Sequence, residues 1–172
     1  MSQRDASPCI RTYRWIDFNP LEPDPVKILI EDIARALSHI CRYNGHVNQF
    51  YSVAEHSLRV SASVPHKDAL WGLLHDAAEA YLGDFVSPLK HHTECGEHYQ
   101  RYEALVMAAV CQRFGLSDHC PASVLRADHE QLQEEEHWLR QPLTGSTWHR
   151  VVTMPPLQAE LEFLNRFREL TR

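Results

Sequence analysis

Several features that define large classes of protein are missing from this sequence. The five cysteines are odd in number and no two have CxxC spacing, which argues against a disulfide framework and a thiolate zinc site. No apolar stretch approaches the roughly 20 residues that a membrane-spanning helix needs. Basic residues are outnumbered, 17 against 23 acidic residues, for a formal net charge of −6. A broad nucleic-acid-binding surface is therefore not expected, whereas a small phosphorylated substrate needs only a few local cations.

Histidine, by contrast, is abundant. Twelve of the 172 residues are histidines, an excess that indicates metal binding or acid–base chemistry, although surface histidines could account for most of it. The length and the apolar content of 44% predict one globular domain over residues 1–172. Reduced thiols, and an N-terminus without an apolar run of signal-peptide length, favour the cytoplasm.

The spacing of the apolar residues predicts an all-α fold, a single bundle of about six helices. Residues 1–28 are rich in proline and are expected to form an extended N-terminal arm, with a short strand between Thr12 and Phe18. Loops are expected over residues 42–51 and 84–92 and around Pro142 and Gly145. Helices are expected over residues 29–41, 52–64, 67–81, 97–114, 121–140 and 157–170.

The helix expected from Ser52 carries a histidine in line with core positions. Ser52 and Glu55 have the spacing of a capping box. A buried histidine must find partners for its ring nitrogens, because an unpaired polar group costs roughly 1–3 kcal/mol. For His56 alone, a bond to a backbone carbonyl is the simpler explanation, and a metal ligand is the alternative. The apolar residues that share its face, at spacings of three and four, are Val53, Val60 and Val64.

The next expected helix contains the sequence Leu-Leu-His75-Asp76-Ala-Ala-Glu79. Neighbouring residues on a helix point about 100° apart, so His75 and Asp76 can grip an ion only at the edge of the helix. Asp76 and Glu79 share a face, where two carboxylates repel unless a cation lies between them or one is protonated. A solvated acidic face is the alternative, but the apolar run directly before His75 argues against it. The small residue Gly72 leaves room for another helix or a ligand.

The helix expected over residues 121–140 places two carboxylates in a leucine stripe. Asp128 and Glu135 alternate there with Leu125, Leu132 and Leu139 at spacings of three and four. Burying a lone carboxylate is expensive, so these residues should be paired or bound to metal. An ion pair with Arg35, with Arg126 or with an arginine of another helix is the alternative.

Taken together, the three helices favour a metal site. His56, His75, Asp76 and Asp128 offer a mixed nitrogen and oxygen donor set, which suits a divalent cation such as Mn²⁺, Fe²⁺, Co²⁺, Ni²⁺ or Zn²⁺. The lack of thiolates makes an open catalytic site more natural than a structural zinc site.

These residues resemble the H…HD…D signature of the HD-domain phosphohydrolases. The stretches around them, together with Gly-Asp84 and Ser87-Pro88-Leu-Lys90, look like the subgroup that contains bacterial 5′-deoxynucleotidases and phage dATP triphosphohydrolases. The resemblance covers residues 17–140. It implies an HD-domain bundle that binds one divalent metal through His56, His75, Asp76 and Asp128.

The resemblance also implies roles for residues around the metal. Glu79 would orient or deprotonate the attacking water, and Arg42 and Lys90 would hold phosphate oxygens. Tyr43 stands where relatives often have a tryptophan that stacks on the base, and Ser87 where a threonine often precedes the proline. Taken without the resemblance, Arg42 and Lys90 can equally be surface cations and Tyr43 a core aromatic.

The expected function is hydrolysis of a deoxynucleoside 5′-monophosphate to nucleoside and phosphate. Removal of triphosphate from a deoxynucleoside triphosphate, notably dATP, is the alternative within the class. Rivals of other classes are a catalytically silent metal-binding interaction module and a structural helical domain with an ion-paired core. By analogy with short members of the family, we expect a homodimer or larger homo-oligomer with a small nucleotide as substrate and neither a nucleic-acid polymer nor a membrane as partner.

Overall fold

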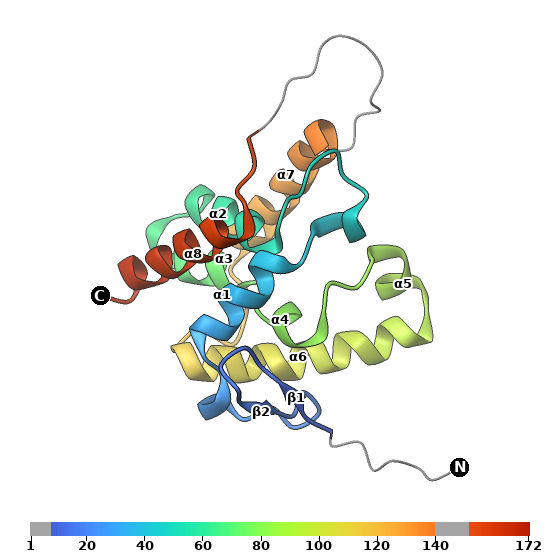
Figure 1. The fold of residues 1–172 in the computed structure, drawn as a ribbon, viewed down its shortest axis with the longest axis vertical. Coiled ribbons are helices and arrows are strands. Elements are labelled where there is room, and N and C mark those ends of the chain that lie inside the picture. The colour runs from blue at the N-terminus through green and yellow to red at the C-terminus, as the bar shows by residue number, and fades with distance from the viewer. Residues whose placement is uncertain (1–7, 140–151) are drawn as a thin grey trace.

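The computed structural model describes residues 8–139 and 152–172, and over this part of the chain it confirms the all-α prediction (Figure 1). The only sheet among the described residues is a hairpin of β1 (Ile10–Arg11) and β2 (Asp17–Phe18). Three short 3-10 helices are η1 (Pro25–Lys27), η2 (Arg42–Gly45) and η3 (His66–Asp68). The α-helices are α1 (Ile30–His39), α2 (Val53–Ser63), α3 (Ala69–Leu74), α4 (Glu79–Leu82), α5 (Ser87–His92), α6 (Glu94–Phe114), α7 (Ala122–Leu139) and α8 (Pro156–Leu170).

Helix α2 lies at the centre of the packing. It contacts α1, α3, α7 and α8, while α1 packs on α8 and the long helix α6 runs beside α4 and α5 (Figure 1). The main core gathers fully buried side chains from these helices, among them Ile33, Leu37, Val53, Leu73 and Phe163. Helices α2 and α7, which carry His56 and Asp128, pack against each other and against α3, which directly precedes His75 and Asp76.

A close approach of α3 to α2 depends on Gly72. A Cβ at that position would lie 3.1 Å from the Cα of Ser61 on α2, tighter than side chains normally allow. The expectation that a small residue makes room there for another helix is confirmed. His75, three residues further along, is thereby brought toward α2.

The helix expected over residues 67–81 is interrupted. Between α3 and α4 the amides of Ala77, Glu79 and Tyr81 donate to the carbonyls three residues earlier, at 3.0 Å each. This bonding is tighter than that of an α-helix. The segment therefore forms η3, α3, a turn over residues 75–78, and α4, and the turn carries His75 and Asp76.

Two more expectations about the elements are corrected. The segment 84–92, expected as a loop, contains α5, and Thr93 caps α6 by accepting a hydrogen bond from the amide of Gly96 (3.1 Å), so α6 begins at Glu94 rather than at residue 97. The described part of the N-terminal arm, expected to be extended with a short strand between Thr12 and Phe18, forms a hairpin and η1, and within that stretch only Asp17–Phe18 is a strand. The predicted helix end at residue 140 and the loop residues Pro142 and Gly145 lie outside the described residues.

The buried stripe of α7 is displaced by one residue over its first turns. Leu125, expected in the core, is 58% exposed. Asp128 consequently sits beside the buried Ala127, at the edge of the core rather than inside it. Its carboxylate can therefore face a pocket. The residues that α7 buries are Val124, Ala127, Gln131, Glu135 and Leu139.

Over the described residues, no helix combines the length and the apolar character needed to cross a membrane.

Candidate metal centre

Helix α2 begins where the sequence predicts and places His56 in the core. The Ser52 hydroxyl caps the helix by accepting a hydrogen bond from the amide of Glu55 at 3.1 Å. The Glu55 carboxylate instead accepts from the backbone amide of Met154 (2.7 Å) and from Arg59 (2.9 Å), so the reciprocal half of the expected capping box is replaced. His56 follows in the first turn and is completely buried.

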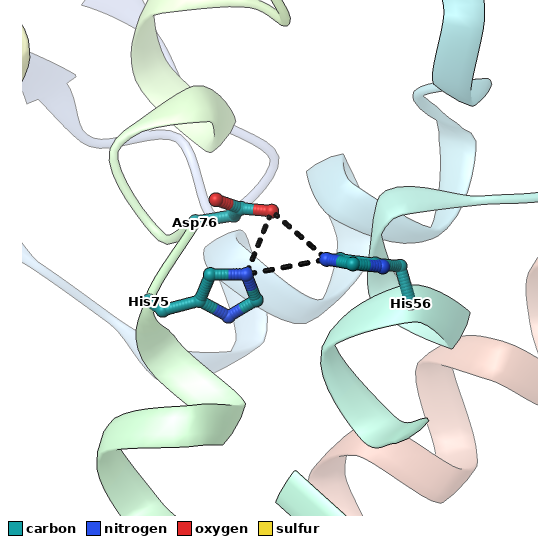
Figure 2. Close-up of side chains that lie close together, drawn as sticks. All are labelled: His56, His75 and Asp76. Atoms are coloured by element: carbon teal, nitrogen blue, oxygen red, sulfur yellow. Dashed lines mark hydrogen bonds and ion pairs between the residues drawn. The ribbon is translucent and has the colours of Figure 1, made fainter. Parts of the chain in front are cut away.

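The four predicted metal ligands converge. The ligand atoms of His56, His75 and Asp76 lie within 4.8 Å of one another, and Figure 2 shows the three side chains pointing toward a common centre. The Nε2 atoms of the two histidines are 3.3 Å apart. Asp128 joins them from α7, with Oδ1 lying 3.0 Å from Nε2 of His56 and 3.7 Å from Nε2 of His75.

The hydrogen bonds fix the tautomer of both imidazoles. Nδ1 of His56 lies 2.7 Å from the Glu135 carboxylate, and Nδ1 of His75 lies 2.8 Å from the Gly72 carbonyl. Both partners are acceptors, so each Nδ1 carries a proton, and in its neutral form each ring would turn the lone pair of Nε2 toward the other. Two lone pairs at 3.3 Å repel each other unless a proton or a metal cation lies between them.

The spacing of the donor atoms fits a metal cation. Donors bound at about 2.1 Å are about 3.0–3.4 Å apart when their angle at the ion is between right-angled and tetrahedral. Here Asp76 Oδ2 lies 3.2 Å from Nε2 of His75 and 3.8 Å from Nε2 of His56, the two Nε2 atoms are 3.3 Å apart, and Asp128 Oδ1 lies 3.0 Å from Nε2 of His56 and 3.7 Å from Nε2 of His75. Three of these five distances fall at that spacing and two are slightly longer. The donor set and its spacing therefore suit the divalent cations expected from the sequence.

The charges around the imidazoles are strongly coupled. Burial lowers the pKa of His75, but the adjacent Asp76 and Asp128 carboxylates outweigh it and hold this pKa well above its usual value. Burial likewise opposes the low pKa values of Asp76 and Asp128, which the histidines bring down below the usual range. The site is thus negative enough to attract either a proton or a metal ion.

Glu79 faces the same space with one free oxygen. The residue is only 8% exposed, and among the described residues Oε2 has no hydrogen-bond partner. Burial raises the pKa of Glu79 well above its usual value, and the carboxylates of Asp76 and Asp84 raise it further. A buried acceptor with increased proton affinity suits a group that takes a proton from water.

A pocket of about 710 Å³ opens beside these residues. Arg42, Tyr43, Ser87 and Lys90, the four predicted substrate contacts, all line it. Asp76, Glu79 and Asp128 form another part of its wall. The structure therefore brings the expected phosphate-binding groups and two of the four predicted metal ligands, Asp76 and Asp128, to one cavity.

Three of the predicted substrate contacts are already engaged within the protein. Lys90 Nζ pairs with Glu103 Oε1 at 2.8 Å, and Arg42 Nε donates to Glu135 Oε2 at 2.9 Å. Burial and the nearby Glu135 carboxylate raise the pKa of Tyr43 to about 12, so its hydroxyl keeps its proton and donates to Glu135 at 3.2 Å. Stacking of Tyr43 on a base stays a prediction.

Glu135 is a residue whose place in the site the sequence did not reveal. Its position in a leucine stripe predicted a paired carboxylate, and the ion-pair alternative holds, with Arg42 as the partner rather than Arg35 or Arg126. Its contact with Nδ1 of His56 also replaces the backbone carbonyl expected for a core histidine. The signal available from the sequence was the pair of carboxylates, Asp128 and Glu135, seven residues apart on one helix.

Comparison with known proteins identifies relatives. No protein-family model matches the chain. The chain is 36% identical over 155 residues to the uncharacterized protein YfdR of Escherichia coli (strain K12), and the alignment covers 84% of this chain and 85% of YfdR. It is 40% identical over 116 residues to the uncharacterized protein RCAP_rcc00048 of Rhodobacter capsulatus, covering 62% of this chain and 58% of that protein. Neither name states an activity, so function has to be argued from the site.

Proposed function

The chain belongs to the same family as YfdR of Escherichia coli, and we propose that it is a metal-dependent phosphohydrolase of the HD type that acts on deoxynucleotides, hydrolysing the 5′-monophosphate. The observation that carries the proposal is the pair of Nε2 atoms that face each other at 3.3 Å, with carboxylates on both sides. The wider resemblance to HD-domain phosphohydrolases supports the same proposal.

His56, His75, Asp76 and Asp128 would hold the metal. A divalent cation supplies Lewis acidity there, which favours attack by water and offsets charge on the phosphoryl oxygens. Glu79, with its unpartnered Oε2, accepts the proton that water releases as its oxygen bonds to phosphorus. The phosphorus–O5′ bond breaks, and the ester oxygen leaves as the nucleoside hydroxyl with the proton that Glu79 took from water, which returns the Glu79 carboxylate to its starting form.

Arg42 and Lys90 supply positive charge on the substrate side. Both line the pocket, and the carboxylates of Glu135 and Asp76 outweigh the effect of burial on Arg42 and raise its pKa above an already high usual value. Arg42 is therefore always charged and can stabilise the additional negative charge of the transition state. The pocket volume of about 710 Å³ falls within the roughly 300–1,000 Å³ of small-ligand sites.

Product analysis tests the proposal. The purified protein is incubated with dAMP and with dATP in the presence of Mn²⁺ or Co²⁺, and the products are separated by chromatography. We expect deoxyadenosine and phosphate from dAMP. Release of triphosphate from dATP alone would instead support the alternative, a dATP triphosphohydrolase.

Two further outcomes would point to the other classes. Stoichiometric metal binding without turnover of any nucleotide would favour a metal-binding interaction module. No metal binding, and no change in metal content between the wild type and His75→Ala, would favour a structural domain whose polar core is held by ion pairs.

A further inference from the structure

Glu135 on α7 collects four hydrogen bonds on one buried carboxylate. Oε1 accepts from Nδ1 of His56 (2.7 Å) and from the Tyr51 hydroxyl (2.8 Å). Oε2 accepts from Nε of Arg42 (2.9 Å) and from the Tyr43 hydroxyl (3.2 Å). The four donors come from α2, from η2 and from the strand-like segment before α2, so the carboxylate ties three parts of the chain together.

The carboxylate is saturated and has no access to the pocket. Its side chain is 0% exposed, and four donors use the lone pairs that two carboxylate oxygens offer. Glu135 therefore does not touch a substrate or a metal itself, and any effect on chemistry must pass through its partners.

Two of the four partners of Glu135, His56 and Arg42, are functional groups of the proposed site. The bond to Nδ1 of His56 leaves Nε2 as the unprotonated nitrogen that faces His75 and Asp128. The bond to Nε of Arg42 occupies one edge of the guanidinium, while Nη1 lies 3.8 Å from Asp76, and both residues line the pocket. A carboxylate behind a metal-bound histidine fixes its tautomer and raises its basicity.

We propose that Glu135 is a positioning residue that sets, through one carboxylate, both the tautomer of the metal ligand His56 and the direction in which Arg42 presents its guanidinium to the substrate. The His56 half of this proposal needs only a metal site, and the Arg42 half rests on the proposed function. Metal affinity and substrate affinity should then fall together when Glu135 is changed.

Glu135→Gln is the central test, because an amide keeps the shape of the side chain but has only one oxygen. It can accept from the His56 side or from the Arg42 side, but not from both. We expect the dissociation constant for Mn²⁺, measured by titration calorimetry, to rise about 10–100-fold. With the metal kept saturating, we expect KM for dAMP to rise several-fold while kcat changes less.

Glu55→Gln is the matched control. Glu55 is as deeply buried as Glu135 and also accepts from an arginine, but its partners are Arg59 and Met154 rather than residues of the site. This variant should lower the melting temperature and leave the Mn²⁺ dissociation constant within about threefold of the wild type. Equal loss of metal affinity in both variants would overturn the proposal, because the effect would then be one of stability alone.

A double-mutant cycle isolates the substrate half. If Glu135 acts on substrate through Arg42, Glu135→Gln should add little to the KM of Arg42→Ala, while its effect on Mn²⁺ affinity persists in the Arg42→Ala background. Full additivity in KM would overturn this half. A protein that binds Mn²⁺ but hydrolyses no nucleotide would refute the proposed function, and the calorimetric comparison would still decide the role of Glu135 at His56.

A measurement on the wild type covers the case in which Glu135→Gln does not fold. Nitrogen-15 NMR of the histidine side chains in metal-free protein at alkaline pH distinguishes the two neutral tautomers. We expect His56 as the Nδ1–H form. The Nε2–H form would overturn the proposal.

Discussion

A divalent cation should raise the thermal stability of the protein, and His75→Ala should abolish that effect. Four ligand groups converge on one point only in the folded chain, so a metal bound there stabilises the folded state. At a free concentration 100-fold above the dissociation constant, the gain is about 2.7 kcal/mol. For a chain of this size, each kcal/mol shifts the melting temperature by roughly 2–4 °C, so a rise of about 5–11 °C is expected.

The metal effect should also grow with pH. The pKa of His75 is held above 6.5 by Asp76 and Asp128, which outweigh the opposing effect of burial. This raised pKa stabilises the metal-free fold fully below 6.5, and the contribution is lost as the pH rises through the folded-state value. A metal must displace the same proton, so its apparent affinity should increase about tenfold per pH unit below that value.

The assay is a thermal melt of chelator-treated protein with and without Mn²⁺ at several pH values, combined with calorimetry in buffers of different ionisation enthalpy to count released protons. His98→Ala serves as the control, because this histidine is exposed on α6 and its loss should leave the shift intact. The reasoning fails if His75→Ala keeps the wild-type shift, or if the shift becomes smaller as the pH rises from 6 toward 8.

Three further predictions address the other parts of the site. Glu79→Gln should lower kcat about 10²–10⁴-fold and leave the Mn²⁺ affinity unchanged. Because burial and the nearby Asp76 and Asp84 raise the pKa of Glu79, the pH profile of kcat should fall on its acid side above pH 4.5 in the wild type, and this fall should be absent from the variant. If steady-state kinetics show the same fall in the variant, another group is the base. Gly96→Ala would place a Cβ against the backbone carbonyls of Leu89 and Lys90, so it should displace α5 and raise KM at unchanged metal affinity, with a loss of about 1–3 kcal/mol in urea unfolding. Ser52→Ala should cost about 1 kcal/mol of unfolding free energy, because the hydroxyl caps α2, and a metal-binding stoichiometry different from the wild type would contradict this purely structural role.

Apolar spacing predicted the helical fold well where a helix buries one continuous face. Helices α1, α2 and α8 begin and end within a few residues of the predicted bounds, and α7 begins one residue from its predicted start. It failed at residues 75–78, because hydrogen bonds three residues apart keep the side chains in nearly helical directions while the backbone tightens. Periodicity reports the side-chain pattern and does not distinguish the two bonding schemes.

The convergence of His56, His75, Asp76 and Asp128 could be predicted because each carries a metal-ligand side chain within an apolar setting. The role of Glu135 could not, because its significance lies in partners 79 to 93 residues away in the chain. Similarly, the displaced stripe of α7 follows from packing of small residues against α2 and α3, which no pattern within α7 itself records. Long-range pairing is the information that a single sequence lacks.

The two imidazoles of the centre differ in whether a substitution can change the hydrogen-bond acceptor of Nδ1. Nδ1 of His75 donates a hydrogen bond to the backbone carbonyl of residue 72. Every amino acid has a backbone carbonyl, so substitution cannot remove this acceptor. Nδ1 of His56 donates a hydrogen bond to the side chain of Glu135, and a substitution at position 135 can remove or weaken this acceptor. Attempts to change the metal preference of the proposed centre should therefore begin at position 135, because the Nδ1 partner of His75 is a backbone carbonyl.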